Sequence, residues 1–201
     1  MDTSTLIILP EYLTLIAEIE EFKGAWTALT GLAPDQLGRL RKVATVESIG
    51  SSTRIEGARL TDGQVEELLG AVERRSFRSR DEEEIAGYAD AMELVFASHE
   101  SIVPPENHLK QLHRVLLEHS SKDTWHHGEY KKLPNHVEAF AADGTSLGVI
   151  FETATPFETP LRMQELIAWL DRELETGRLH VLLVIALAIV RFLAIHPFQD
   201  G

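Results

Sequence analysis

The feature of the sequence that most constrains the fold is an apolar run near its end. Val181–Val190 contains no polar side chain and is bounded by His180 and Arg191. A helix that crosses a bilayer needs about 20 apolar residues, roughly twice the length of this run. We therefore expect a buried helix here. Because Leu179–Ile195 is apolar on nearly all sides, we predict that it is the central helix, which other helices surround.

Helical periodicity continues through most of the chain and predicts an all-α fold. Capping boxes formed by Thr61 with Gln64 and by Ser79 with Glu82 mark two helix starts. A third start is predicted with Thr159 as the cap. The predicted helices cover residues 11–29, 34–56, 61–69, a stretch from Ser79 through Val95, a stretch ending near His119, Thr159–Gly177 and Leu179–Ile195.

The pattern changes between Ser120 and Thr159, where glycine and proline separate short β-prone pieces. The two clearest pieces are NHVEAF and GVIF, which predict one β-hairpin. The expected organisation is an N-terminal helical module over residues 1–78 and a helical core over residues 79–201. The hairpin then belongs to the core.

Composition excludes several classes of function. The net charge of −13 argues against nonspecific nucleic-acid binding, which depends on Lys and Arg. The chain has no cysteine, which suits a reducing compartment. Its N-terminal segment lacks a basic region and is rich in glutamate, unlike a secretory signal peptide. We therefore expect a cytoplasmic protein without membrane or nucleic-acid partners.

The last helix runs into the sequence IHPFQDG, which combines residue types that carry out chemistry. Pro197 cannot continue a helix, so His196 is placed at the end of a rigid element. A histidine can act as a general base, and Asp200 offers oxygen ligands to a divalent cation. Gly201 can present its N–H to an anion. The simpler interpretation is a histidine that suits the helix dipole, followed by an ordinary Asp-Gly turn.

The stretch HPFQDG resembles the first six residues of the Fic family signature, His-Pro-Phe-x-Asp/Glu-Gly-Asn-Gly-Arg. The resemblance implies a Fic-like helical bundle around a central apolar helix, with the β-hairpin as a flap over the active site. It implies that His196 deprotonates a hydroxyl and that Asp200 holds Mg²⁺ on the nucleotide phosphates. Phe198 then anchors the loop, and Gly201 begins the anion hole.

A second stretch, SSTRIEG, occurs far upstream at residues 51–57. On a helix Ser52 and Glu56 share one face, and Gly57 is a natural helix stop. A surface helix end with these common residues is the simpler interpretation. The stretch is also similar to the inhibitory motif Ser/Thr-x-x-x-Glu-Gly/Asn of one class of Fic proteins. That resemblance implies that Glu56 enters the nucleotide pocket and blocks productive binding of ATP, and in some relatives it orients a water that removes AMP.

The resemblance spans about residues 34–201 and implies a protein adenylyltransferase. Such an enzyme transfers AMP from ATP, with Mg²⁺, to a Ser, Thr or Tyr hydroxyl of a target protein, and often modifies itself or forms homodimers. The printed sequence stops inside the signature, before its Arg, so we expect this chain to transfer AMP weakly or not at all. A catalytically dead helical interaction module and a helical metal-dependent hydrolase built on His196 and Asp200 are the alternatives.

Overall fold

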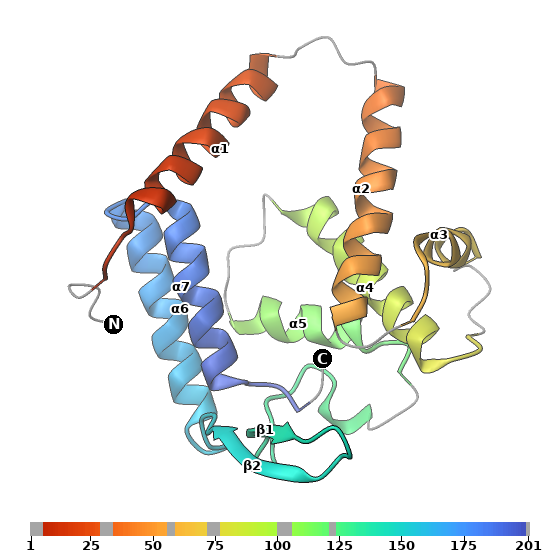
Figure 1. Cartoon of the computed structure of the whole chain (residues 1–201), viewed down its shortest axis with the longest axis vertical. Coiled ribbons are helices and arrows are strands. Elements are labelled where there is room, and N and C mark those ends of the chain that lie inside the picture. Colours follow the sequence, from red (N-terminus) through yellow and green to blue (C-terminus); the bar gives the residue numbers. More distant parts are fainter. Residues whose placement is uncertain are drawn as a thin grey trace. The chain divides into compact units, whose positions relative to one another are not determined.

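The computed structural model describes residues 6–28, 34–55, 59–71, 77–99, 106–120 and 124–199. Within them the chain forms seven α-helices, one short 3-10 helix and a two-stranded antiparallel sheet (Figure 1). The predicted helical class with a single hairpin is therefore confirmed. The chain divides into two compact units, residues 1–45 and 46–201. This boundary lies well before residue 78, where the sequence predicts the end of an N-terminal module.

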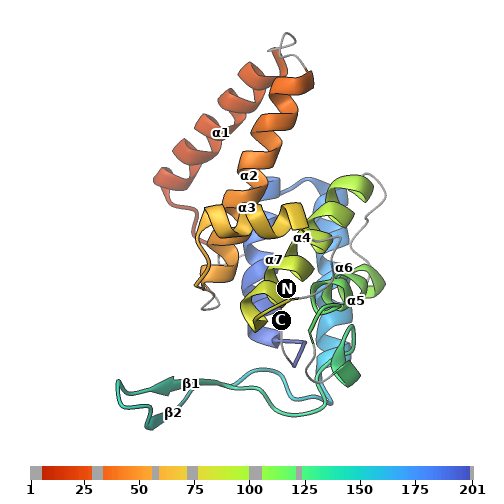
Figure 2. The same ribbon diagram turned by 90° about the vertical axis from the view of Figure 1, so that its right-hand side faces the viewer.

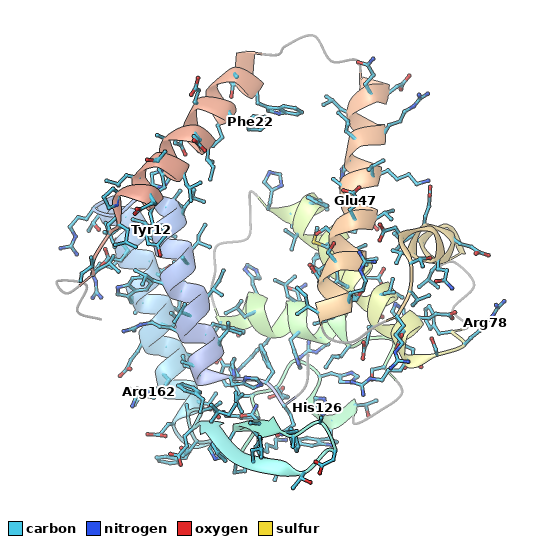
Figure 3. All side chains as sticks on the ribbon, in the orientation of Figure 1. Tyr12, Phe22, Glu47, Arg78, His126 and Arg162 are labelled. Carbon is cyan, nitrogen blue, oxygen red and sulfur yellow. The ribbon has the colours of Figure 1, made fainter. Side chains whose placement is uncertain are left out.

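The first unit contains α1 (Pro10–Ala28) and the beginning of α2 (Pro34–Ile55). Proline begins both helices, where its missing N–H costs no intrahelical hydrogen bond. Helix α1 exposes many large apolar side chains, and two of its rings, Phe22 and Trp26, stack with centroids 6.0 Å apart. Figure 3 labels Tyr12 and Phe22 among these side chains. The exposed apolar residues of α1 are Tyr12, Leu13, Leu15, Ile19, Phe22 and Trp26.

The second unit begins with the later turns of α2, which share a small core with α3 (Asp62–Ala71) and α4 (Arg80–Ser98). Its buried members are Val46, Ile49, Val65 and Ile85. The helix starts follow the predicted caps. The N–H of Thr61 donates to Gln64 Oε1 at 2.9 Å, and the N–H of Glu82 donates to Ser79 Oγ at 3.3 Å.

Helix α5 (Glu106–Leu116) packs closely against α4. The close approach depends on Gly87 of α4, because a Cβ atom at this position would overlap the carbonyl group of Leu116. Glycine here therefore has a packing reason rather than a conformational one. Three residues further along α4, Asp90 Oδ2 lies 2.7 Å from Nε2 of His119, in the turn after α5.

Helices α6 (Thr159–Thr176) and α7 (Val181–Ile195) lie side by side (Figures 1 and 2). Their buried residues form the main core together with Tyr130 and Phe198: Met163, Leu166, Trp169, Val184 and Ile195. Among the described residues, one face of α7 is left exposed, with Ile189 53% and Leu193 59% accessible. The predicted apolar helix is thus present and is covered on the side that faces α6.

The start of α6 differs from the prediction that Thr159 is its cap. Thr159 is the first helical residue, and its hydroxyl donates to the carbonyl of Thr155. The capping box is formed earlier, since the N–H of Thr155 donates to Glu158 Oε2 and the N–H of Glu158 donates to Thr155 Oγ1. Hydrogen bonds from the hydroxyl and the N–H of Thr155 hold the pKa of the exposed Glu158 carboxyl below its usual value. The Thr-Pro-Phe-Glu sequence competes successfully with Thr159 because it offers both partners of the box.

The segment between α5 and α6 contains the 3-10 helix η2 (Thr124–His126) and the hairpin of β1 (Val137–Phe140) and β2 (Ser146–Phe151). Glu138 pairs with Val149 and Ala139 with Gly148, with irregularities on either side of these pairs. Figure 2 shows the hairpin extending away from the helices of this unit. All six residues of β2 are exposed, so the hairpin contributes little to the core.

No helix in the described part of the chain combines the length and the apolar character that crossing a membrane requires.

Candidate active site

His196 lies at the C-terminal end of α7 in the left-handed conformation, with φ 50° and ψ 65°. It is the one non-glycine residue with positive φ in the described part of the chain. Its N–H donates to the carbonyl of Phe192 at 2.8 Å, which closes the helix end. Glycine usually occupies such a cap, and a residue with a side chain there is strained. Pro197 follows, so the helix cannot continue past the half-buried imidazole.

Phe198 fixes the loop after α7 in the core, where it is 6% exposed. Its ring stacks on the imidazole of His113 with centroids 3.9 Å apart and an interplanar angle of 8°. Tyr130 and Phe192 contact it at tilted angles. Phe198, which precedes Gln199 at the variable position of the motif, is therefore buried. The polar residues of the described loop, His196 and Gln199, lie on either side of it in the sequence.

His113 is itself held in one tautomer. Its Nδ1 accepts a hydrogen bond from the N–H of Gly128 at 2.8 Å, so the proton of the neutral ring is on Nε2. Gly128 has φ 75°, and a Cβ there would come within 2.8 Å of the carbonyl oxygen of Lys110. His126, labelled in Figure 3, lies beside this pair with its ring centroid 6.4 Å from that of His113. The imidazoles thus form part of the packed support of the loop.

The residues that hold the backbone of the loop come from one short segment, residues 131–135, which we call the clamp segment. Its hydrogen bonds reach four consecutive carbonyl groups, those of residues 195–198. Lys131 Nζ donates to the carbonyl of Ile195 at 3.0 Å, and the N–H of Lys131 donates to that of Pro197 at 2.8 Å. Asn135 Nδ2 donates to the carbonyl groups of His196 at 3.3 Å and Phe198 at 2.7 Å.

Lys131 is the centre of this arrangement and is 2% exposed. Its ammonium group has three protons and three oxygen partners: Asn135 Oδ1 at 2.7 Å, Thr153 Oγ1 at 3.0 Å and the Ile195 carbonyl. Burial lowers the pKa of Lys131 to about 8, because removal from water disfavours the charged form. Thr153 follows β2, so the end of the hairpin also takes part in holding the loop. No motif in the sequence indicates a role for Lys131, Asn135 or Thr153.

Ser52 lies in the last turns of α2 and accepts a hydrogen bond from the hydroxyl of Tyr88 on α4, with an O···O distance of 3.1 Å. Arg54 Nη1 pairs with Asp62 Oδ1 of α3 at 2.8 Å. The end of α2 is therefore attached to both following helices. Glu56 and Gly57 of the predicted inhibitory motif lie outside the described residues, as do Asp200 and Gly201 of the predicted metal and phosphate sites.

Two cavities adjoin the loop. An apolar cavity of about 300 Å³ is lined by Tyr88 and Met92 of α4, by His113 of α5 and by Phe198, among others. A more polar cavity of about 340 Å³ is lined by Thr153, Arg191 and Ile195, among others, and by Arg162 of α6, which Figure 3 labels. The hydroxyl that holds Ser52 therefore belongs to a residue that shares a cavity with Phe198.

In the described part of the chain, no group of three or more His, Asp or Glu side chains is arranged to hold a metal ion. The described site accordingly consists of one positioned histidine, its supporting hydrogen bonds and the two adjoining cavities.

Comparison with known proteins places this arrangement in a family. The sequence profile of the Fic/DOC family matches residues 103–201. The chain is 29% identical over its full length to a protein named protein adenylyltransferase Fic from Drosophila grimshawi, and 28% identical over 92% of its length to the protein of the same name from Drosophila mojavensis. It spans 37% and 34% of those two proteins.

A solved structure gives the same result at the level of the fold. The crystal structure of a Fic domain-containing signalling protein from Bacteroides thetaiotaomicron superposes with a TM-score of 0.74 and 32% sequence identity, over 91% of this chain and 66% of that one. The described positions agree with this assignment, since His196 and Phe198 occupy the loop that follows the apolar helix. Residues 103–201 of the chain therefore belong to the Fic/DOC family.

Proposed function

We propose that the chain is the Fic part of an enzyme that transfers AMP from ATP to a hydroxyl side chain of a target protein. The observation that carries the proposal is the placement of His196. His196 lies at the end of α7, in a loop that is anchored by the buried ring of Phe198. The clamp segment holds the carbonyl groups of this loop. The relatives named protein adenylyltransferase support the choice of reaction.

In the proposed reaction, His196 takes the proton of the target hydroxyl as its oxygen attacks the α-phosphorus of ATP. A phosphoester bond to the target forms, the bond between the α-phosphorus and the bridging oxygen breaks, and pyrophosphate leaves. Proton transfer by a placed histidine contributes roughly 10²–10⁴-fold to such rates. Most of the remaining catalysis in phosphoryl and nucleotidyl transfer comes from positioning and from neutralisation of phosphate charge.

The co-substrate in this proposal is ATP carrying Mg²⁺. Asp200 is the residue proposed to face the metal, because carboxylate oxygens are the ligands that Mg²⁺ prefers. Gly201 is proposed to offer its N–H to the phosphates, as backbone N–H groups do in anion-binding turns. They follow His196 by four and five residues in the sequence, so we propose that both act close to the base.

We also propose that Glu56 restrains the enzyme from the end of α2. A carboxylate beside the triphosphate is repulsive and opposes the productive arrangement of ATP. The attachment of Ser52 to Tyr88 supports this role, because it fixes the turn of α2 that precedes Glu56. Control of the reaction would then reside in a helix end rather than in the loop.

The proposal is tested by labelling proteins with ATP that carries the radioactive label on either the α- or the γ-phosphate. Two forms are compared, the 201-residue chain and a polypeptide that continues through Asn-Gly-Arg after Gly201. Adenylyl transfer predicts that the extended form attaches the α-label, but not the γ-label, to protein. Attachment of the γ-label, or release of phosphate without any protein labelling, contradicts the proposal and favours another transfer or a hydrolase.

A further inference from the structure

We propose that Lys131 and Asn135 are positioning residues for His196: together they hold the four carbonyl groups of residues 195–198 and so set the direction of the imidazole. This inference rests on the proposed function for its kinetic consequence, although its structural consequence can be measured without any activity. In the described part of the chain, the hydrogen bonds of both side chains go to the loop, to Thr153 or to each other, so we assign them a positioning role.

The hydrogen bonds of the two side chains form a closed set. The ammonium of Lys131 uses all three of its protons on oxygen. Asn135 uses its amide nitrogen on two loop carbonyls, while its Oδ1 accepts from Lys131 Nζ and, at 3.2 Å, from Thr153 Oγ1. A fully satisfied buried network rigidifies its surroundings, because moving any member leaves a partner without its hydrogen bond.

Ending a helix does not require this network, as α6 shows. Helix α6 ends with Gly177 at φ 59°, and the N–H of Gly177 donates to the carbonyl of Glu173. Helix α7 also ends with a residue in the left-handed region, but that residue is a histidine, which is strained there, and a buried cation lies against the last carbonyl of the helix. Desolvating an ammonium group is unfavourable. The strained histidine and the buried ammonium group therefore both cost free energy at the end of α7. This cost is explained if the loop after the helix must keep one conformation.

The neighbouring residue Lys132 provides a matched comparison. It is exposed, and its Nζ lies 5.4 Å from the ring centroid of Trp125 instead of against the loop. The two lysines are adjacent in sequence but only Lys131 reaches the carbonyl of Ile195. Replacing either lysine by methionine removes one positive charge and leaves a side chain of similar length. A difference between the two variants therefore reports the hydrogen bonds of Lys131.

The structural test is amide hydrogen exchange measured by mass spectrometry on the 201-residue chain. We expect Lys131→Met and Asn135→Asp to speed exchange in a peptide covering the end of α7 and its loop by roughly tenfold, the effect of losing one or two hydrogen bonds. A peptide from the middle of α6 should exchange as in the wild type, and so should both peptides in Lys132→Met. Asn135→Asp serves as the second variant because Asn135 is only partly buried and its replacement keeps the shape of the side chain.

The kinetic test uses the polypeptide that continues through the signature. Loss of positioning predicts that Lys131→Met lowers kcat for AMP transfer by roughly 10- to 100-fold, since small displacements of a catalytic group have effects of this size. The KM for ATP should change little, and Lys131→Arg, which keeps a cation of similar reach, should recover part of kcat.

The outcomes separate the inference from the proposed function. Unchanged exchange at the α7 loop in both Lys131→Met and Asn135→Asp overturns the positioning role, and so does an increase shared equally with the α6 peptide. If the variants exchange faster at the α7 loop but the extended wild-type polypeptide transfers no AMP, the positioning role stands. That result contradicts the proposed reaction instead. A rise in KM with kcat unchanged assigns the segment to nucleotide binding and contradicts the inference.

Discussion

The ring of Phe198 lies flat on the imidazole of His113, with centroids 3.9 Å apart and the planes 8° from parallel. His113 belongs to α5, and Phe198 follows α7 by three residues. This stack therefore joins the loop that carries His196 to a helix from a distant part of the sequence. The orientation of His113 is in turn fixed by the N–H of Gly128.

Because Phe198 is buried among aromatic rings, Phe198→Ala should be strongly destabilising. We expect a loss of about 3–5 kcal/mol in the free energy of unfolding, the usual range for deleting a buried phenylalanine. Phe157 is 94% exposed and supplies the control, so Phe157→Ala should change stability by less than about 0.5 kcal/mol. Urea unfolding monitored by circular dichroism measures both, and equal effects of the two substitutions would argue against a structural anchor at Phe198.

The hydrogen bond between Tyr88 and Ser52 can be isolated with a double-mutant cycle. Tyr88→Phe and Ser52→Ala each remove it, and each should lower the free energy of unfolding by about 1 kcal/mol. Since the second change then has no hydrogen bond left to remove, the double variant should be less destabilised than the sum by about 0.5–1.5 kcal/mol. Strictly additive effects would show that the two hydroxyl groups do not interact in solution.

Lys131 should give stability a distinctive pH dependence. Its pKa is about 8 in the folded chain and 10.5 in the reference state, so between these values the unfolded chain binds more protons at this site. Stability contributed by this group therefore rises as pH increases from about 8 to 10.5, as the unfavourable burial of the cation is relieved. In Lys131→Arg the side chain stays charged and the rise should be absent. Chemical denaturation of both proteins across this range measures the difference, and parallel curves would contradict the lowered pKa.

Removal of the proposed inhibitory carboxylate should increase AMP transfer. We expect Glu56→Gly, in the polypeptide continued through the signature, to raise self-labelling from α-labelled ATP by roughly tenfold, as the repulsion between carboxylate and triphosphate disappears. Glu47 is exposed on α2, and Figure 3 labels it, so Glu47→Gly is a control for replacing a glutamate by glycine and for the loss of one negative charge. Unchanged or lower labelling in Glu56→Gly, or an equal rise in Glu47→Gly, would remove the basis for inhibition by Glu56.

The features that the sequence predicts well are those whose signals are local. The apolar run of α7, the Pro197 that ends it and the two capping boxes at Thr61 and Ser79 all depend on residues a few positions apart. The signature resemblance likewise lies within six consecutive residues. The helix patterns each have one dominant physical interpretation, whereas the HPFQDG stretch is identified through its resemblance to a family signature.

The supporting contacts of the loop could not be predicted because they join distant residues. Lys131 and Ile195 are 64 positions apart, and Asn135 and Phe198 are 63 apart. Nothing in the sequence KKLPNH indicates which of two adjacent lysines is buried. The wrong cap at Thr159 has a different cause, since two overlapping cap sequences compete and Thr155 with Glu158 offers both partners of a capping box.

The central claim is that His196 is the base of an adenylyl transfer, and one measurement tests it most directly. Three forms of the polypeptide continued through the signature are incubated with Mg²⁺ and ATP labelled on the α-phosphate. All three carry Glu56→Gly; the parent form has no other change, and the other two carry His196→Ala or His99→Ala in addition. His99 is exposed at the end of α4 and serves as the control. The account predicts labelling that persists in His99→Ala and falls by roughly 100-fold or more in His196→Ala. Labelling that survives in His196→Ala would contradict the role of His196 as the base. A parent form that is not labelled at all would contradict adenylyl transfer.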